Sequence, residues 1–190
     1  MGFLSRLLGR TEPPGAWKPS VVAHQAFDGA IRVVETPRGP GWEHAEDSRQ
    51  GDGFSVMVLK YILPATPSPL ALLAKIYTNA EDRPPPEDPA RTDWRGVFRP
   101  LLPETSSVTT LATRQLTMTK ALPAWEAVLD GLGADSGAPL RIRERRAVVD
   151  RELFIVTGMG SPALFEAHAA DVDRWFDSVA FVPIGDAPAR

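Results

Sequence analysis

Cysteine is absent from this chain of 190 residues. Without a thiol, the protein cannot form a disulfide, a zinc–thiolate site or a cysteine nucleophile, and it cannot carry a lipid on an N-terminal cysteine. A chain without disulfides suits a reducing compartment, although secreted proteins can also lack cysteine. We therefore expect a cytoplasmic protein.

The chain also lacks a long apolar run and an excess of positive charge. No segment approaches the roughly 18 consecutive apolar residues that a membrane-spanning helix requires. The formal net charge is −3, with 21 Lys and Arg against 24 Asp and Glu. No overall positive field therefore attracts nucleic acid or an anionic membrane, and we expect no nucleic-acid partner.

Motifs for catalysis and cofactor binding are missing as well. The histidines His24, His44 and His168 have no zinc-binding spacing, and no Gly-x-Ser-x-Gly nucleophile elbow occurs. Glu43 and His44 open an acidic segment that could hold a divalent cation or small ligand, although a solvated loop is the simpler interpretation. We predict no cofactor, and the absence of a catalytic constellation favours a protein that is not an enzyme.

The first 18 residues read as a tail or short amphipathic helix followed by a linker. Four apolar residues recur there at helical spacing: Phe3, Leu4, Leu7 and Leu8. Such a segment can lie on a membrane surface or dock on a partner, or it can be a frayed tail. Membrane contact is therefore expected only through residues 1–10, if at all.

The C-terminal part reads as strand, tight turn, strand and helix. Residues 140–149 and 153–159 form the two strands, and residues 150–151 form the turn. Ser161 and the proline after it provide an N-cap and a first helical residue for a helix over residues 162–178. Its predicted apolar stripe consists of Phe165, Ala169, Val172, Phe176 and Val179. This helix must pack on the sheet, because the stripe alone cannot offset the cost of ordering it.

The earlier elements are mostly strands. We predict strands over residues 21–27, 30–36, 54–63, 108–119 and 122–129, with a helix as the alternative for the last of these. Residues 43–52 read as a strand end and turn, and helices are predicted to begin at residues 68–69 and 88–89. Strands and helices are segregated along the chain, so the fold class is α+β, with an antiparallel sheet covered by helices.

Arginines are concentrated on one predicted strand. Arg141, Arg143 and Arg145 alternate and so share one face of that strand, and Arg146 adds charge nearby. Because the planar guanidinium favours carboxylates, an acidic protein partner could dock there. The alternative is a solvated sheet face whose arginines pair with acidic neighbours, for which the candidates are Glu126, Asp130 and Glu152.

Three short motifs resemble the PsbP-like superfamily, which includes an extrinsic photosystem protein, a Ran-binding nuclear-transport factor and many bacterial proteins. They lie at residues 30–42, a strand and loop that end in Pro-Arg-Gly-Pro-Gly-Trp, at residues 122–124 (Leu-Pro-Ala) and at residues 148–157, the closing hairpin. In that hairpin Arg151 replaces the usual glycine, which leaves a three-residue loop open as an alternative to the two-residue turn.

The resemblance implies a PsbP-like α/β/α sandwich, here a single domain over residues 19–183 followed by a tail at 184–190. The shared motifs are structural and imply no catalytic or ligand residue. The prediction is therefore a non-catalytic protein-interaction or accessory module with a protein partner. The alternative is a small-ligand-binding protein or enzyme with a pocket between the sheet and the helices.

Overall fold

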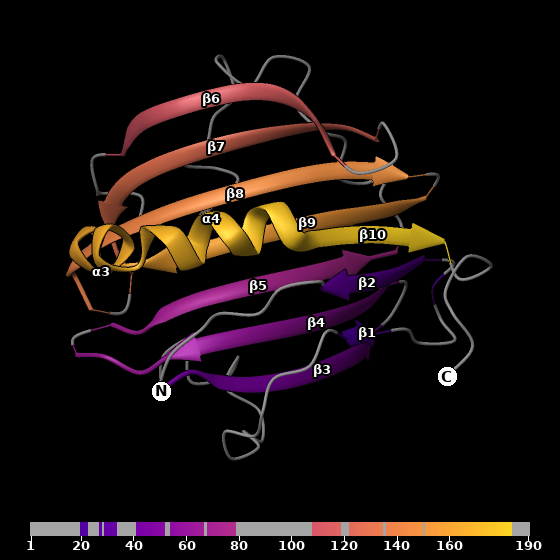
Figure 1. Ribbon diagram of the computed structural model, residues 1–190, viewed down its shortest axis with the longest axis horizontal. Helices are drawn as coiled ribbons and strands as arrows, with labels where there is room; N and C mark the ends of the chain where they lie inside the picture. The colour runs from indigo at the N-terminus through magenta and orange to yellow at the C-terminus, as the bar shows by residue number, and fades with distance from the viewer. Residues whose placement is uncertain are drawn as a thin grey trace.

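A computed structural model places two antiparallel sheets and two helices (Figure 1). It describes residues 20–22, 27, 29–33, 41–51, 54–66, 68–78, 108–118, 122–134, 136–149 and 151–183. No helix within these ranges is long and apolar enough to cross a membrane. The N-terminal residues 1–18, His24 and the helix predicted to begin at residues 88–89 lie outside them.

The larger sheet has seven strands in the order β3-β4-β5-β9-β8-β7-β6. Its strands are β3 (Glu43–Gly51), β4 (Phe54–Leu63), β5 (Leu70–Tyr77), β6 (Thr109–Met118), β7 (Leu122–Leu132), β8 (Pro139–Val149) and β9 (Glu152–Gly160). Every neighbouring pair is antiparallel. The β5–β9 pairing joins the two consecutive meanders β3-β4-β5 and β6-β7-β8-β9 at the centre of the sheet.

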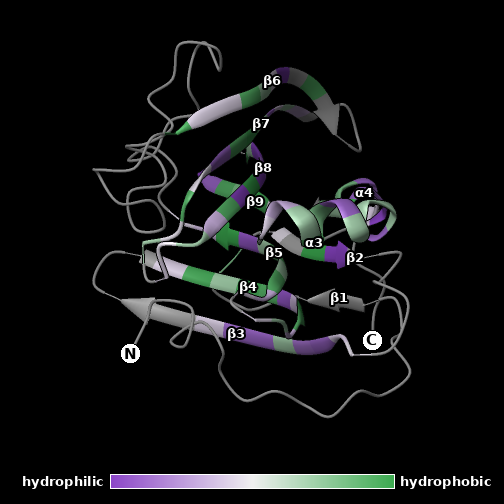
Figure 2. Ribbon diagram, turned by 90° about the vertical axis from the view of Figure 1, so that its left-hand side faces the viewer, coloured by the Kyte–Doolittle hydropathy of each residue, from purple (hydrophilic) through white to green (hydrophobic). Residues whose placement is uncertain are grey.

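One face of this sheet carries both helices and a second, smaller sheet (Figures 1 and 2). The helices are α3 (Pro162–Ala167) and α4 (Ala169–Ser178), and the small sheet pairs β1 (Ser20–Val22), β2 (Gly29–Val33) and β10 (Val179–Pro183) in the order β1-β2-β10. The predicted α+β class with an antiparallel sheet is confirmed. Both described helices of the predicted α/β/α sandwich lie on this one face.

Apolar residues are buried on both faces of the large sheet. On the helix face, Phe154 and Val156 of β9 pack with Phe165, Val172 and Phe176 of the helices. Gly158 lets these helices approach, because a Cβ there would lie 3.2 Å from the Phe165 ring and 3.3 Å from the Phe176 ring. The opposite face buries a second cluster: Val56, Val58, Ile62, Ala71, Leu73, Trp125, Ala127, Leu129, Leu140, Ile142 and Met159.

Several local predictions are confirmed. Residues 122–129 belong to a strand, not a helix, and residues 54–63 form β4 in the interior of the sheet. Val149 pairs with Glu152, so the closing hairpin has a two-residue turn despite Arg151. The Ser161 side chain accepts a hydrogen bond from the backbone N–H of Leu164, as expected of an N-cap.

The prediction of a helix that begins at residues 68–69 is wrong, because Leu70–Tyr77 is strand β5. This strand lies between β4 and β9 and is buried on both faces at its first five positions. A strand covered on both faces shows no alternation of apolar and polar residues. Its leucines and alanines therefore look like the apolar side of a helix.

Two further boundaries differ from the prediction. Residues 43–51 form the full edge strand β3, and an edge position tolerates their polar composition. The closing helix is broken at His168, and Val179 starts β10 instead of extending the helix stripe. Ala169 is exposed, whereas Trp175 is buried. The strand at residues 179–183 was not predicted, because its partner β2 lies far away in the sequence.

Candidate binding cleft

A cleft opens to solvent between helices α3–α4 and strands β7–β8. Its volume is about 250 Å³. The lining residues are Glu126, Val128, Arg141, Arg143, Phe165, Glu166, Ala169, Val172 and Asp173. Apolar side chains and both signs of charge therefore meet in one opening.

Strand alternation and register explain why these charges meet. Arg141, Arg143 and Arg145 point to the helix face of β8, as their spacing predicts. The antiparallel register sets Asp130 opposite Arg141, Val128 opposite Arg143 and Glu126 opposite Arg145. Each of these three arginines is therefore within reach of a β7 carboxylate on the same face of the sheet.

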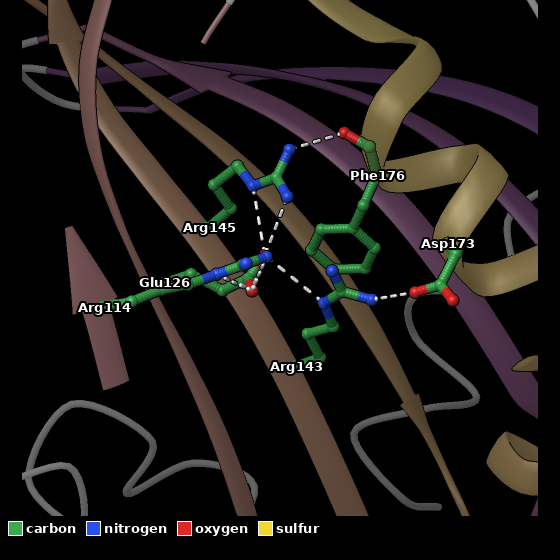
Figure 3. A network of polar contacts seen from close by, with 6 residues as sticks. All are labelled: Arg114, Glu126, Arg143, Arg145, Asp173 and Phe176. Carbon is green, nitrogen blue, oxygen red and sulfur yellow. Dashed lines mark hydrogen bonds and ion pairs between the residues drawn. The ribbon is translucent and has the colours of Figure 1, made fainter. Parts of the chain in front are cut away.

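Glu126 is the centre of a buried network of charges (Figure 3). Its Oε2 accepts hydrogen bonds from Arg145 Nε at 3.1 Å and Arg145 Nη2 at 2.9 Å. Arg143 Nε lies 3.2 Å from the same oxygen. The other oxygen, Oε1, accepts from Arg114 Nε at 2.9 Å, with Arg114 Nη2 2.7 Å away. One carboxylate is thus shared by three guanidinium groups.

Burial and charge act in opposite directions on the pKa of Glu126. Burial of the carboxyl group raises the pKa, but the positive charges of Arg143, Arg145 and Arg114 outweigh it and hold the pKa below its ordinary value. Glu126 is therefore ionised at neutral pH. Burial lowers the pKa of Arg145, against the opposing effect of Glu126.

Arg145 also fixes the end of helix α4. Its Nη1 donates a hydrogen bond of 2.6 Å to the backbone carbonyl oxygen of Phe176, in the last turn. A cation at this end satisfies a carbonyl that has no partner within the helix and complements the helix dipole. The Phe176 ring lies 4.3 Å below the Arg143 guanidinium, which adds a cation–π contact.

The mouth of the cleft has a different character. Arg141 makes a two-point contact with Asp130, at 2.7 Å from Nε and 2.8 Å from Nη2. Its Nη1 faces Glu166 Oε1 at 3.5 Å, and Arg143 Nη1 donates to Asp173 Oδ1 at 2.6 Å. The side chains of Glu166 and Asp173 are 73% and 65% exposed. These two helix carboxylates therefore form a solvated rim above half-buried arginines.

This arrangement suits recognition better than proton transfer. Both oxygens of Glu126 accept from guanidinium groups, and its pKa is lowered, so it is a poor acid or base at neutral pH. Arg141 and Arg143 present guanidinium nitrogens beside the apolar side chains of Val128, Phe165 and Val172. The cleft can thus hold a ligand that combines an anionic and an apolar group.

The structure divides the predicted arginine group. Arg141, Arg143 and Arg145 lie together beneath the helices, and Arg145 is buried. Arg146 points to the opposite face, where it pairs with Glu144 and lies 5.2 Å above the Trp125 ring. Whether these residues bind a partner stays a prediction.

In the alternative interpretation of the sequence, the arginines pair with acidic neighbours. This pairing occurs with two of the three candidates. Arg141 pairs with Asp130, and Glu126 pairs with its neighbours on β8. The face is only partly solvated, because α3 and α4 cover part of it and the cleft beside them opens to solvent. Glu152 lies elsewhere, near Gly29 of β2. The rim carboxylates of Glu166 and Asp173 were missed, because a helix sequence does not say which strand its polar face meets.

The predicted ligand residues Glu43 and His44 lie on β3, apart from the cleft. His44 Nε2 lies 3.6 Å from Glu46 Oε1, and its ring packs against Tyr61. Within the described ranges, no group of three or more histidine and acidic side chains could hold a metal ion. His168 is half-buried at the α3–α4 break, 6.1 Å from the Trp42 ring. The tail residues Phe3, Leu4, Leu7 and Leu8 fall outside the described part.

No family model matches the sequence, and a search of curated proteins finds no significant match. Solved structures are similar in fold. LpqN of Mycobacterium tuberculosis, described as involved in cell envelope biogenesis, is 12% identical with a TM-score of 0.51, over 87% of this chain and 91% of LpqN.

Two other solved structures match across most of the chain. PA94 of Pseudomonas aeruginosa, a protein of unknown function, is 10% identical with a TM-score of 0.49, over 86% of this chain and 97% of its own. CyanoP, the PsbP of the cyanobacterium Synechocystis, is 10% identical with a TM-score of 0.48, over 93% of this chain and 99% of its own. At these identities the likeness to these structures concerns the fold alone. The two scores below 0.5 carry no further conclusion.

Proposed function

We propose that this protein is a non-catalytic interaction or accessory protein that binds a protein partner in the cleft between α3–α4 and β7–β8. The observation that carries the proposal is the open cleft of about 250 Å³. Pockets that enclose a drug-sized ligand typically measure about 300–1,000 Å³. This cleft is open to solvent and lies at the small end of that scale, so it is better matched to a few side chains of a larger partner.

The chemistry of the walls supports the same proposal. The charged groups that line the cleft are held by one another, as Arg143 is by Glu126 and Asp173. Such groups recognise shape and charge, and they do not offer a poised acid, base or nucleophile. Guanidinium groups beside apolar side chains are common at protein interfaces.

The alternative function, binding of a small ligand, would use the same cleft, which does lie between the sheet and the helices. A thermal-shift screen of metabolites separates the two functions, because a ligand well above its Kd raises the melting temperature. A metabolite that stabilises the protein and requires the cleft would favour the alternative.

Neighbouring alanines on α4 allow a matched test of the cleft. Ala169 lines it, whereas Ala170 is exposed and outside the lining. We expect Ala169→Trp to fill the cleft and to lose, in pull-downs from the native host, proteins that the wild type and Ala170→Trp both recover. Equal recovery by all three proteins would reject the cleft as the contact surface. Thermal melts of both variants establish that each is folded.

A further inference from the structure

The structure assigns a chemistry to the partner of the proposed function, on which this inference rests. We propose that the cleft binds an acidic peptide segment of a partner protein. The carboxylates of this peptide replace those of Glu166 and Asp173 as the partners of Arg141 and Arg143. An apolar side chain between the acidic residues would lie against Val128. When no partner is bound, the rim carboxylates of this chain occupy the place that the carboxylates of the peptide would take.

A charge imbalance on the strands supports this assignment. Arg114, Arg141, Arg143 and Arg145 lie on the strand side of the network, where, among the strand residues that the structure describes, the carboxylates of Glu126 and Asp130 are bonded to them. The described contacts that meet the remaining positive charge come from the helices, through Glu166 and Asp173. The sheet thus presents more positive charge than its own acidic residues neutralise.

The strand carboxylates and the helix carboxylates differ in how easily they can be replaced. The side chain of Glu126 is 5% exposed and that of Asp130 is 29% exposed. If either carboxylate moved away from its arginines, charges would be left without partners in a poorly solvated site. Glu166 and Asp173 are 73% and 65% exposed and can turn into water at little cost. An incoming carboxylate therefore competes with the rim and leaves the inner pairs intact.

The two arginines at the mouth are well placed for such an exchange. Nη1 of Arg141 and Nη1 of Arg143 are the atoms that face the rim. Their side chains are only 19% and 14% exposed, and a charged hydrogen bond gains strength where water is partly excluded. Phe165 and Val172 form the apolar wall near them. The complementary ligand is a short segment with two acidic residues around an apolar one.

Nucleic acid fits this site less well than an acidic peptide. The chain carries a net charge of −3, and the exposed rim of the cleft is itself acidic. The aromatic residue of the lining, Phe165, is buried and offers no face on which a base could stack. A peptide whose acidic groups are few and spaced avoids the repulsion that a phosphate backbone would meet.

Selection from a displayed library of random heptapeptides tests the chemistry without assuming a sequence. The library is selected on the full-length wild-type protein and counter-selected on Ala169→Trp, so that retained peptides depend on the cleft. We expect enrichment of Asp and Glu flanking an aliphatic or aromatic residue. Retained peptides without acidic enrichment, or no peptides that depend on the cleft, would overturn the inference.

The rim carboxylates allow a second test, which measures the binding of an acidic peptide retained in the selection. Asp173→Asn and Glu166→Gln should each tighten its binding about two- to fivefold in fluorescence anisotropy, the scale of one exposed ion pair. Glu46→Gln removes an equal charge from β3, outside the cleft, and should leave the affinity unchanged. Unchanged or weaker binding by the rim variants would overturn the inference, as would displacement by a single-stranded oligonucleotide or by inorganic phosphate.

The two proposals can fail separately. If the Ala169→Trp protein still recovers every partner of the wild type, the function assigned to the cleft is wrong. If that variant loses its partners, but the retained peptides are uncharged or basic, the function stands and only the acidic chemistry is wrong.

Discussion

Glu126 is the residue on which the buried charge network depends. The whole residue is 4% exposed, and its carboxylate is shared by Arg114, Arg143 and Arg145. Arg145 is 6% exposed, so its charge is also withdrawn from water. A buried charge that loses its partner destabilises a protein strongly, whereas an exposed one is resolvated.

Glu126→Gln should therefore destabilise the fold by about 3–5 kcal/mol, the usual cost of breaking a buried ion pair from one side. Urea unfolding, monitored by tryptophan fluorescence, measures the change in the free energy of unfolding. Glu166→Gln is the matched control, because it makes the same substitution at the exposed rim of the same cleft and should change stability by less than about 0.5 kcal/mol. Similar losses in the two variants would contradict the distinction between the inner carboxylate and the rim.

At the scale of the element, the closing helix is two helices with separate anchors. α3 begins at the Ser161 cap and buries Phe165, and it ends at His168. α4 buries Val172, Trp175 and Phe176 and is held at its last turn by Arg145. The cleft spans both helices, so its shape depends on each anchor.

The N-cap of α3 provides a prediction at this scale. Ser161→Ala removes the acceptor for the Leu164 N–H and should cost about 1 kcal/mol, as N-cap serines usually do. Ser161→Asp keeps an acceptor at this position and adds a favourable charge at the helix N-terminus, so its stability should stay close to that of the wild type. Thermal melts compare the three proteins, and equal losses in both variants would show that the hydroxyl does not act as a cap.

At the scale of the whole molecule, the charge network links stability to pH. The pKa of Glu126 is lower in the folded chain than the ordinary value of 4.5. A carboxyl group whose pKa falls on folding contributes stability in full above its unfolded pKa. That contribution decreases as the pH falls through the folded pKa, because the unfolded chain then binds the proton more readily.

Arg114→Gln tests this linkage without disturbing the buried partners. The Arg114 side chain is 58% exposed, so its removal should cost about 0.2–1 kcal/mol at neutral pH. Because one of the charges that lower the pKa of Glu126 is gone, acid unfolding should also begin at a higher pH than in the wild type. Circular dichroism between pH 7 and pH 2 measures the transition. Arg32→Gln, at an exposed position of β2, is the control, and identical shifts in both variants would contradict the linkage.

The sequence by itself determined the local features of this protein. The Ser161–Pro162 start of α3 follows from interactions between residues close in the chain. The two-residue turn after β8 and the strand at residues 122–129 were each one of two alternatives that the local sequence allowed. The alternation of Arg141, Arg143 and Arg145 likewise placed them on one face, because successive side chains of any strand point to opposite sides. The α+β class follows from the segregation of these local patterns.

Only the tertiary structure decided what covers each face. β5 is buried on both sides because β4 and β9 flank it, and β9 pairs with it from about eighty residues away. The arginine face became the wall of a cleft because α3 and α4 fold back over β8, which brings Asp173 to Arg143. Local periodicity sets the side to which a residue points. The free energy gained by burying that side depends on strands and helices distant in the chain. This free energy determines which element packs against it.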